Sequence, residues 1–317
     1  MEVRNKTVLV TGGAGFIGSH LVERLLLEGC KVIVPYIEIE EKSYFKSQNL
    51  EKKVKLTLCD VRDWKAVSNL IKTNRIDFVF HLAAQAIVED ALSDPRETFE
   101  TNIMGTVNVL EAVRRFGKVK GIVVTSSDKA YGKIPRAREN DPLSGNHPYE
   151  SSKSSADLVA QTYYSTYLMP VVVTRFGNVY GEGDINFSRI IPGILKAVAG
   201  GEKLKIRSDG KYVRDYVYVG DIVDSMILIL KNIEKISGEV FNVSSFENLS
   251  VIELLKKAEL ILKVKINFEI SNTAVNEIPV QSIDFEKISK KLGWEPNNKL
   301  EDTLESIFNW YSNYFSK

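Results

Sequence analysis

The feature that most constrains the fold is a glycine-rich turn near the start of the chain. The run TVLVTG (7–12) is short and rich in β-branched residues, which is typical of a strand buried on both faces. In the following GGAGFIGSHLVERLLLEG, Gly12, Gly15 and Gly18 recur every third residue and leucines continue at helical spacing. A second strand is predicted over 31–34. A strand, glycine turn, helix and strand in this order predict a dinucleotide-binding unit, with the pyrophosphate at the helix N-terminus.

Strands and helices are predicted to alternate through the next part of the chain. The predicted strands are 54–60, 77–83, 121–127 and 170–176, and the predicted helices are 63–72, 95–116 and 148–168. This alternation indicates the α/β class, with a doubly wound parallel sheet (Rossmann) and right-handed crossovers. Ligands of such sheets lie outside the carboxyl ends of the strands, and the first strand and the strands over 77–83, 121–127 and 170–176 all end in small or polar residues.

The sequence pattern changes after Phe176. A glycine-rich loop is predicted over 177–187, and shorter elements follow it. The predicted helices are 188–200, 221–232, 250–264 and 300–314, and the predicted strands are 204–207, 239–245 and 265–270. These elements indicate a smaller α/β C-terminal substrate domain. The predicted division gives residues 1–178, with 216–246 returning, to an NAD-binding Rossmann domain, and residues 179–215 and 247–317 to the second domain.

The choice of dinucleotide depends on the residues after the second and third strands. The acidic residue that usually follows the second strand is missing, because Pro35 and Tyr36 stand there. Glu38 is the nearest substitute for holding the adenosine ribose, and Asp60 with Val61 is predicted to hold the adenine edge. No arginine follows the second strand to accept a 2′-phosphate, so NAD is favoured and NADP stays open.

Composition excludes several classes of function. The chain has 317 residues with 42 basic and 41 acidic side chains, so a nucleic-acid or membrane-surface binder with a basic excess is not expected. Cys30 and Cys59 lie in apolar runs, which fits a reducing compartment, and no signal peptide is recognised. We therefore expect a cytoplasmic protein. His20, His81 and His147 lack ligand spacing, so no metal site is predicted.

The candidate catalytic residues lie between Gly121 and Lys153. Ser127, Asp128 and Lys129 follow the strand, while Tyr149 and Lys153 share one face of the next helix because they are four residues apart. Among 13 tyrosines and 42 basic residues, roughly one or two such spacings arise by chance. Position, not spacing, therefore carries the prediction: the pair opens the helix after a strand of a dinucleotide fold.

Tyr149 is the candidate general base. A tyrosine titrates near pH ~10, and a neighbouring ammonium together with a nicotinamide cation is expected to lower that value. Tyr149 then accepts the proton of a sugar or alcohol hydroxyl while hydride leaves for the cofactor.

Longer segments of the chain resemble a known family. TGGAGFIG, HLAAQ, SSDKAYG, HPYESSK and RFGNVYGEGD resemble the extended short-chain dehydrogenase/reductase superfamily, and are most similar to its nucleotide-sugar 4,6-dehydratases of the CDP-glucose type. FETNIMGTVNVLEA, RDYVYVGD and KKLGWEP extend the resemblance over essentially the whole chain. The subfamily assignment depends on Asp128-Lys129, since related 4-epimerases lack this pair and dTDP-glucose dehydratases carry Asp-Glu there.

The resemblance implies an internal redox cycle. Tyr149, held by Lys153 and Ser127, removes the proton of the carbon-4 hydroxyl as hydride passes to NAD. Lys129 helps to take the carbon-5 proton, and Asp128 protonates the departing carbon-6 hydroxyl. Hydride then returns to carbon 6 and gives a 4-keto-6-deoxy sugar. The alternatives are a UDP-sugar 4-epimerase, in which Asp128 and Lys129 are idle, and a non-catalytic nucleotide-binding sensor.

The resemblance also implies the binding residues. The cofactor-binding set is Gly12, Gly15, Phe16, Ile17, Gly18, Glu38, Asp60, Val61, Leu82, Ala83, Ala84, Gln85, Asn102, Thr125, Tyr149, Lys153 and Phe176. The set for a nucleotide-diphosphate sugar is Gln85, Asn178, Arg189 and Arg214, in which arginine suits phosphate oxygens. No arginine stands near Val280 to identify the base or sugar. A homodimer through 95–116 and 148–168 is expected, with no nucleic-acid or membrane partner.

Overall fold

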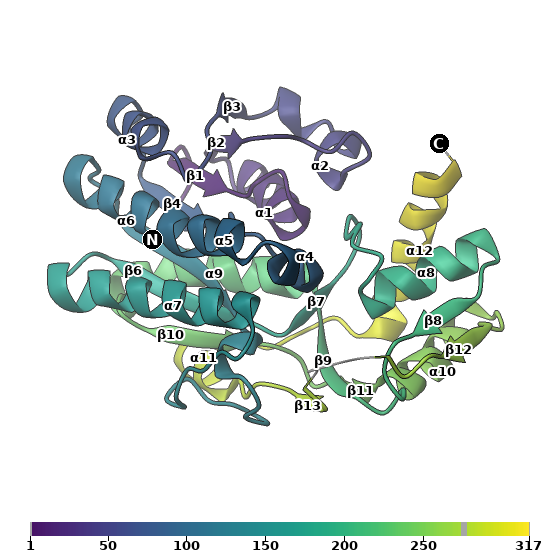
Figure 1. The fold of residues 1–317 in the computed structure, drawn as a ribbon. Helices are drawn as coiled ribbons and strands as arrows, with labels where there is room; N and C mark the ends of the chain where they lie inside the picture. The colour runs from purple at the N-terminus through teal and green to yellow at the C-terminus, as the bar shows by residue number, and fades with distance from the viewer. Residues whose placement is uncertain (1, 274–277, 317) are drawn as a thin grey trace.

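A seven-stranded parallel sheet forms the centre of the computed structural model, which describes residues 2–273 and 278–316 (Figure 1). The strand order is β10-β6-β5-β4-β1-β2-β3. The strands are β1 (Thr7–Thr11), β2 (Lys31–Tyr36), β3 (Lys55–Leu58), β4 (Phe78–His81), β5 (Gly121–Ser127), β6 (Val171–Phe176) and β10 (Val240–Val243). The predicted doubly wound sheet is confirmed. Strand order reverses between β1 and β4, which is where ligands of such sheets bind.

Both faces of the sheet are covered by helices, because successive strand residues point to opposite faces. Val8 and Val10 pack in one core, and Leu9 between them packs in the other. The first core includes side chains of α1 (Phe16–Leu27) and α9 (Val219–Ile236). The second includes side chains of α3 (Trp64–Thr73), α6 (Gly105–Phe116) and α7 (Pro148–Tyr167).

The predicted helix over 95–116 is interrupted. It consists of α5 (Pro95–Phe99), a π-helical turn η2 (Glu100–Met104) and α6. Each π turn inserts one extra residue and rotates the residues beyond it around the helix axis. Asn102 lies in this turn and is buried.

A second lobe lies beside the sheet, on the right of Figure 1. Its helices are α8 (Ile190–Gly200), α10 (Val251–Leu262) and α12 (Leu300–Ser316), and their apolar faces form a separate core. Its strands are β7 (Asn178–Tyr180), β8 (Leu204–Ile206), β9 (Val213–Tyr218), β11 (Asn248–Ser250), β12 (Phe268–Ile270) and β13 (Val280–Gln281). The remaining helices are α2 (Tyr44–Ser47), η1 (Leu50–Lys52), α4 (Val88–Ser93), η3 (Asp128–Tyr131) and α11 (Glu286–Leu292).

Several second-lobe elements differ from the sequence-based expectation. The stretch 177–187 was expected to be a loop, but β7 lies within it and pairs with β9. The short strands β11 and β13, which also pair with β9, were not predicted.

Other features of the chain can be compared with the expectations from the sequence. Ser250 caps α10 in a capping box with Glu253. Both cysteines are buried, as expected. Within residues 2–273 and 278–316, no helix has the length and apolar character needed to cross a membrane. The domain boundaries stay a prediction.

Candidate active site

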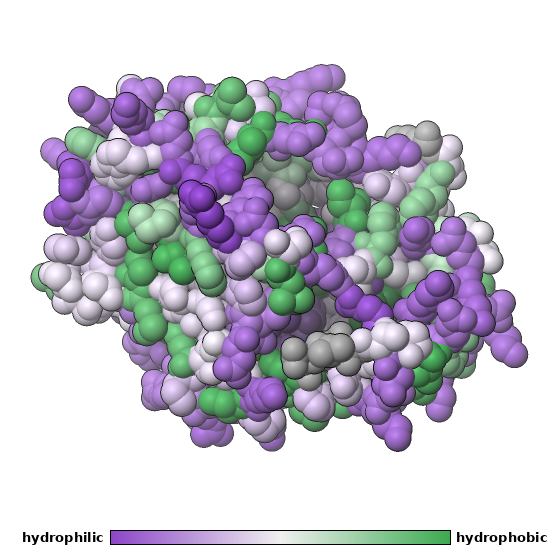
Figure 2. Space-filling model, in the orientation of Figure 1, coloured by the Kyte–Doolittle hydropathy of each residue, from purple (hydrophilic) through white to green (hydrophobic). Residues whose placement is uncertain are grey.

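A cleft of about 1320 Å³ opens at the carboxyl ends of β1, β4, β5 and β6 and extends under α8 and β9. Figure 2 shows it as the hollow between the two lobes. Most of the predicted site residues line it, namely Gly12, Gly15, Phe16, Ile17, Gly18, Glu38, Val61, Leu82, Ala83, Ala84, Thr125, Ser127, Asp128, Lys129, Tyr149, Lys153, Phe176, Asn178, Arg189 and Arg214. Three predicted residues do not line it, namely Asp60, Gln85 and Asn102.

The three glycines have different structural requirements. Gly12 has φ +68°, and a Cβ there would lie 2.8 Å from the Ala83 nitrogen. A Cβ at Gly18 would lie 2.0 Å from the Gly12 carbonyl oxygen, so α1 approaches β1 only with glycine here. Gly15 is the N-cap of α1 and makes no side-chain cap, and a Cβ there would meet only the Gly12 oxygen at 3.3 Å. The first turn of α1 is therefore open to an anion.

A buried histidine links β1, β4 and α6 beneath this turn. His81 Nδ1 lies 2.8 Å from Thr11 Oγ1, and His81 Nε2 lies 3.0 Å from Thr106 Oγ1. The Thr106 hydroxyl donates to the Asn102 carbonyl, so Thr106 accepts from His81 Nε2–H. Thr11 also accepts from the Ala83 N–H at 3.2 Å. Burial lowers the pKa of His81 to about 3, so the ring is neutral.

The side chain of Asn102 holds the backbone after β4 in place. Its Oδ1 accepts from the Gln85 N–H at 2.7 Å, and its Nδ2 donates to the Gln85 carbonyl at 3.0 Å. The same Nδ2 donates to Ser152 Oγ on α7 at 2.8 Å. Asn102 therefore shapes the wall of the cleft from behind, where it makes no direct contact with the cavity.

The residues predicted for the adenosine end are polar and more exposed. Glu38 is exposed at the edge of the cleft after β2. Asp60 forms an ion pair with Arg62 at 2.6 Å, and Arg62 also contacts Glu97 at 3.1 Å. Hydrogen bonds from Arg62 lower the pKa of Asp60 against the opposing effect of burial.

Tyr149 and Lys153 enter the cleft from the first turns of α7. Pro148 begins the helix, and His147 caps it by accepting from the Tyr149 N–H at 3.2 Å. Lys153 Nζ donates to the Thr125 carbonyl on β5 at 2.8 Å. Burial lowers the pKa of Lys153 to about 8, partly offset by Asp157.

The pKa of Tyr149 is raised in the protein alone, whereas the sequence predicted a lowered value with the cofactor present. Burial is the largest cause, and the charge of Asp128 adds to it. Arg189 and a hydrogen bond with Ser127 oppose these effects. The ammonium of Lys153 is directed to the Thr125 carbonyl, so it does not offset the burial of the phenol.

Ser127, Asp128 and Lys129 meet at the end of β5, where the chain turns into η3. The Ser127 hydroxyl donates to Asp128 Oδ1 at 2.8 Å, and Lys129 Nζ approaches the same oxygen at 3.3 Å. Asp128 is 2% exposed, while the Lys129 side chain is partly exposed to the cleft. Neutral and charged donors therefore converge on one carboxylate oxygen.

Asn178 is directed at carboxylates in this structure. Its Nδ2 donates to Asp215 Oδ1 at 3.3 Å and lies 3.5 Å from Asp128 Oδ2. Asp215 is fully buried on β9 and was not among the predicted site residues. Its only sequence signal is a carboxylate beside Arg214 in the run YVRDYVYV, whose other residues are apolar or aromatic.

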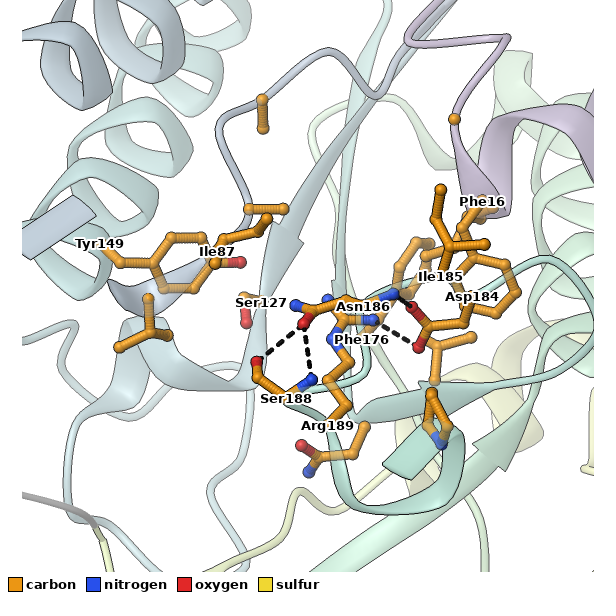
Figure 3. A pocket seen from close by; sticks show the side chains of 18 of the residues that line it. Phe16, Ile87, Ser127, Tyr149, Phe176, Asp184, Ile185, Asn186, Ser188 and Arg189 are labelled. Carbon is orange, nitrogen blue, oxygen red and sulfur yellow. Dashed lines mark hydrogen bonds and ion pairs between the residues drawn. The ribbon is translucent and has the colours of Figure 1, made fainter. Parts of the chain in front are cut away.

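The two predicted arginines lie on the second-lobe side. Figure 3 shows Ser127 and Tyr149 on one side of the pocket and Arg189 with Asp184 on the other. Arg189 forms an ion pair with Asp184 at 3.1 Å, and burial raises the pKa of Asp184 against this pairing. Arg214 lines the cleft beside Tyr212, 5.7 Å from the ring centre.

Known proteins are similar to this chain in both sequence and fold. A family model described as GDP-mannose 4,6 dehydratase matches residues 9–307. The chain belongs to this family. The resemblance to nucleotide-sugar 4,6-dehydratases predicted from the sequence is thus confirmed at the level of the family.

The proteins similar to this chain include both dehydratases and epimerases. The human dTDP-D-glucose 4,6-dehydratase is 31% identical over 324 residues, covering 98% of this chain and 91% of the relative. The UDP-glucose 4-epimerase of Thermotoga maritima, solved with UDP-glucose, has a TM-score of 0.89 at 30% identity and covers 98% and 99% of the two chains. The dTDP-glucose 4,6-dehydratase of Bacillus anthracis, solved with NAD, has a TM-score of 0.84 at 29% identity and covers 97% of each chain.

A polar contact also crosses the cleft. Glu89 on α4 forms an ion pair with Arg207, which follows β8, and accepts from the Ser188 hydroxyl at 3.3 Å. Glu89 therefore links the two lobes at the rim of the cleft. Among the described residues, no group of three or more His, Cys, Asp and Glu side chains is placed to hold a metal ion.

Proposed function

We propose that the protein is a nucleotide-sugar 4,6-dehydratase that uses NAD. The observation that carries this proposal is Asp128, a buried carboxylate in the same cleft as Tyr149, with Lys129 bound to it at 3.3 Å. Oxidation at carbon 4 needs one base, which both dehydratases and epimerases require. Loss of the carbon-6 hydroxyl also needs an acid, and in this proposal Asp128 supplies it.

The glycine cradle supports the cofactor. Gly12, Gly15 and Gly18 leave room for backbone approach, and the uncapped first turn of α1 suits a pyrophosphate. NAD, when bound, accepts hydride from carbon 4 of the sugar and returns it to carbon 6. The nicotinamide end would lie near Tyr149 and Lys153, because both line the same cleft as the cradle.

The chain's own residues then move three protons. Tyr149 accepts the carbon-4 hydroxyl proton, and this needs cations close by, because burial raises its pKa in the protein alone. Lys129 accepts the carbon-5 proton, which a 4-ketone acidifies. Asp128 protonates the carbon-6 oxygen as its bond to carbon breaks, and water leaves. Arg189 and Arg214 would hold the diphosphate from the second lobe.

A homodimer is part of the same proposal. Figure 2 shows hydrophobic residues gathered over α6 and α7. Phe99, Met104 and Leu158, on or beside these helices, are at least one-third exposed. A second copy would cover such side chains.

The proposal is tested by incubating the purified protein with CDP-glucose, GDP-mannose, dTDP-glucose or UDP-N-acetylglucosamine and measuring product mass. Loss of one water supports the dehydratase. An unchanged mass with inverted configuration at carbon 4 would instead support a 4-epimerase, the activity of the Thermotoga maritima structure. No turnover of any sugar would favour a nucleotide sensor.

Asp128→Asn isolates the acid. The amide keeps the size of the side chain and removes its transferable proton, so water loss is expected to fall at least a hundredfold while carbon 4 is still oxidised. Reduced-nicotinamide absorbance in a single turnover reports the oxidation. Equal loss of both steps would contradict the acid role.

A further inference from the structure

A second buried carboxylate lies behind Asp128. Asp215 comes from β9, whereas Asp128 begins η3, and the amide of Asn178 on β7 lies between them. Asn178 Nδ2 is 3.3 Å from Asp215 Oδ1 and 3.5 Å from Asp128 Oδ2. A primary amide nitrogen carries two N–H groups, so one can point to each carboxylate. Two acids from different lobes are therefore joined by one neutral bridge.

The donors that Asp215 receives in the described structure are neutral. The Ser244 hydroxyl and the Ile283 N–H, the latter at 3.2 Å, both donate to Oδ2, while Asn178 donates to Oδ1. Asp128 differs, because Ser127 and the charged Lys129 both bind its Oδ1. The Oδ2 of Asp128 therefore faces the neutral amide of Asn178, while the cation binds Oδ1.

The charges around Asp215 indicate that it interacts electrostatically with Asp128. Burial raises the pKa of Asp215 to about 6, and the charge of Asp128 is the next largest cause. Hydrogen bonds from Ser244, Ile283 and Asn178 oppose this rise. Lys129 faces the pair from η3 and binds Asp128 directly.

The strand neighbours of Asp215 point elsewhere. Arg214 and Tyr216 flank it on β9, so their side chains leave the opposite face of the strand and line the cleft.

We infer that Asp215 is a positioning residue for the water-loss step, which holds Asp128 in place through the amide of Asn178. This inference rests on the proposed dehydratase function. Two like charges in one buried site disfavour the doubly ionised state, and a proton shared by the pair belongs to both acids.

The proton balance of the step is closed. The step begins from the ion pair: one proton moves from the Lys129 ammonium to the Asp128 carboxylate across their 3.3 Å contact, which leaves Lys129 a neutral amine. Lys129 takes the carbon-5 proton as the carbon-6 oxygen takes the proton of Asp128, and the carbon–oxygen bond breaks. Lys129 is then an ammonium and Asp128 a carboxylate, and their 3.3 Å contact lets the proton return.

A titration of the carboxyl groups tests the interaction between Asp128 and Asp215 without measuring enzyme activity. The full chain, labelled with ¹³C at the aspartate carboxyl carbons, is titrated by NMR in the absence of sugar. Ser244→Ala removes a donor from Asp215 alone and should raise its midpoint, which identifies its signal. In Asp128→Asn the midpoint of Asp215 should fall by about one unit or more, because the neighbouring charge is gone. An unchanged midpoint overturns the inference.

Kinetics of Asp215→Asn test the positioning role. With the sugar that the wild type dehydrates, oxidation of carbon 4 should stay within about threefold, while water loss slows at least tenfold and loses its pH dependence near 6. A merely structural role would slow both steps equally. If this variant does not fold, Ser244→Ala should shift the pH profile of water loss upward, and an unshifted profile overturns the inference.

The two experiments separate this inference from the proposed function. A wild type that releases no water from any sugar removes the dehydratase proposal and with it the positioning role. The carboxyl titration then still reports whether Asp128 and Asp215 interact.

Discussion

The ammonium of Lys153 donates a hydrogen bond to the Thr125 carbonyl at 2.8 Å, which ties α7 to β5 inside the cleft. Burial lowers the pKa of this lysine to about 8. A desolvated ammonium destabilises the folded chain, so the site holds Lys153 at the expense of stability.

Lys153→Met should therefore stabilise the cofactor-free protein at pH 7 while abolishing turnover. The lowered pKa of Lys153 corresponds to about 3 kcal/mol of lost folding stability, which the variant regains. Losing the hydrogen bond to the Thr125 carbonyl offsets about 1 to 2 kcal/mol of this gain. Because the folded pKa lies below the unfolded value, the unfolded chain binds more protons between pH ~8 and ~10.5, and wild-type stability rises with pH there. Urea unfolding at pH 7 and pH 10 measures both effects.

Lys118→Met is the matched control, since Lys118 is exposed in the loop after α6. Its free energy of unfolding should match the wild type within about 0.5 kcal/mol. A Lys153→Met protein that is less stable at pH 7 and keeps the wild-type rise toward pH 10 would contradict the prediction.

Gly15→Ala and Gly18→Ala should separate cofactor binding from folding. At Gly18 a Cβ would lie 2.0 Å from the Gly12 oxygen, so we expect a loss of several kcal/mol in stability or no folded protein. At Gly15 the backbone is at φ −79° and the Cβ has only a 3.3 Å neighbour, so the fold should survive. NAD affinity should fall at least tenfold, because the methyl group occupies the pyrophosphate approach.

Thermal unfolding and NAD titration of both variants measure the difference. If Gly15→Ala binds NAD as tightly as the wild type, the pyrophosphate does not lie over the start of α1. If Gly18→Ala folds with wild-type stability, the close packing of α1 on β1 is not required.

The first lobe was predictable because its signals are local. Strand, glycine turn and helix follow one another in the sequence, and Tyr149 and Lys153 lie one turn apart. The side of the helix on which Asn102 lies was not predictable, because η2 inserts an extra residue into an otherwise regular helix. This insertion leaves Asn102 buried against Gln85 and Ser152, outside the cleft.

The second lobe was less predictable because its pairings are short and non-local. β7, β11 and β13 have two or three residues each, and all three pair with β9. No periodicity can be read from so few residues. Asp215 becomes visible only when β9 brings it beside Asn178, so its contact with the site depends on tertiary structure.

His81→Gln should reduce the loss of stability in acid. The folded pKa of about 3 lies below the unfolded value near ~6.5, so the unfolded chain binds more protons between them. Stability contributed by neutral His81 is therefore present above pH ~6.5 and is lost as pH falls toward 3, by up to about 5 kcal/mol. Glutamine does not titrate, and its amide can still reach Thr106.

Denaturant unfolding from pH 7 to pH 4 compares the two proteins. His81→Gln should be less stable at pH 7, because it loses the hydrogen bond to Thr11, but its free energy should change less with pH. Equal slopes in both proteins would show that His81 does not contribute to acid sensitivity.

Asp157→Asn should destabilise the fold and slow water loss, because a buried ion pair supports the turn that carries Asp128. Arg175 contacts Asp157 through two nitrogens at 2.8 and 3.1 Å, and both side chains are at most 2% exposed. Arg175 also donates to the Tyr131 hydroxyl at 2.6 Å, and Tyr131 ends η3. Without the charge of Asp157, the buried guanidinium of Arg175 has no counter-charge, and the free energy of unfolding is expected to fall by about 3 to 5 kcal/mol.

Glu111→Gln provides the contrast for Asp157→Asn. Glu111 is paired with Arg114 and Arg115 on the surface of α6, where ion pairs contribute up to about 1 kcal/mol. Urea unfolding should therefore separate the two variants by about 2 kcal/mol or more. Asp157→Asn should also slow water loss more than carbon-4 oxidation, because η3 carries the Asp128–Lys129 pair, whereas Tyr149 is placed by the first turn of α7. Equal slowing of both steps would show that Asp157 acts through α7 and its Lys153, and not through η3.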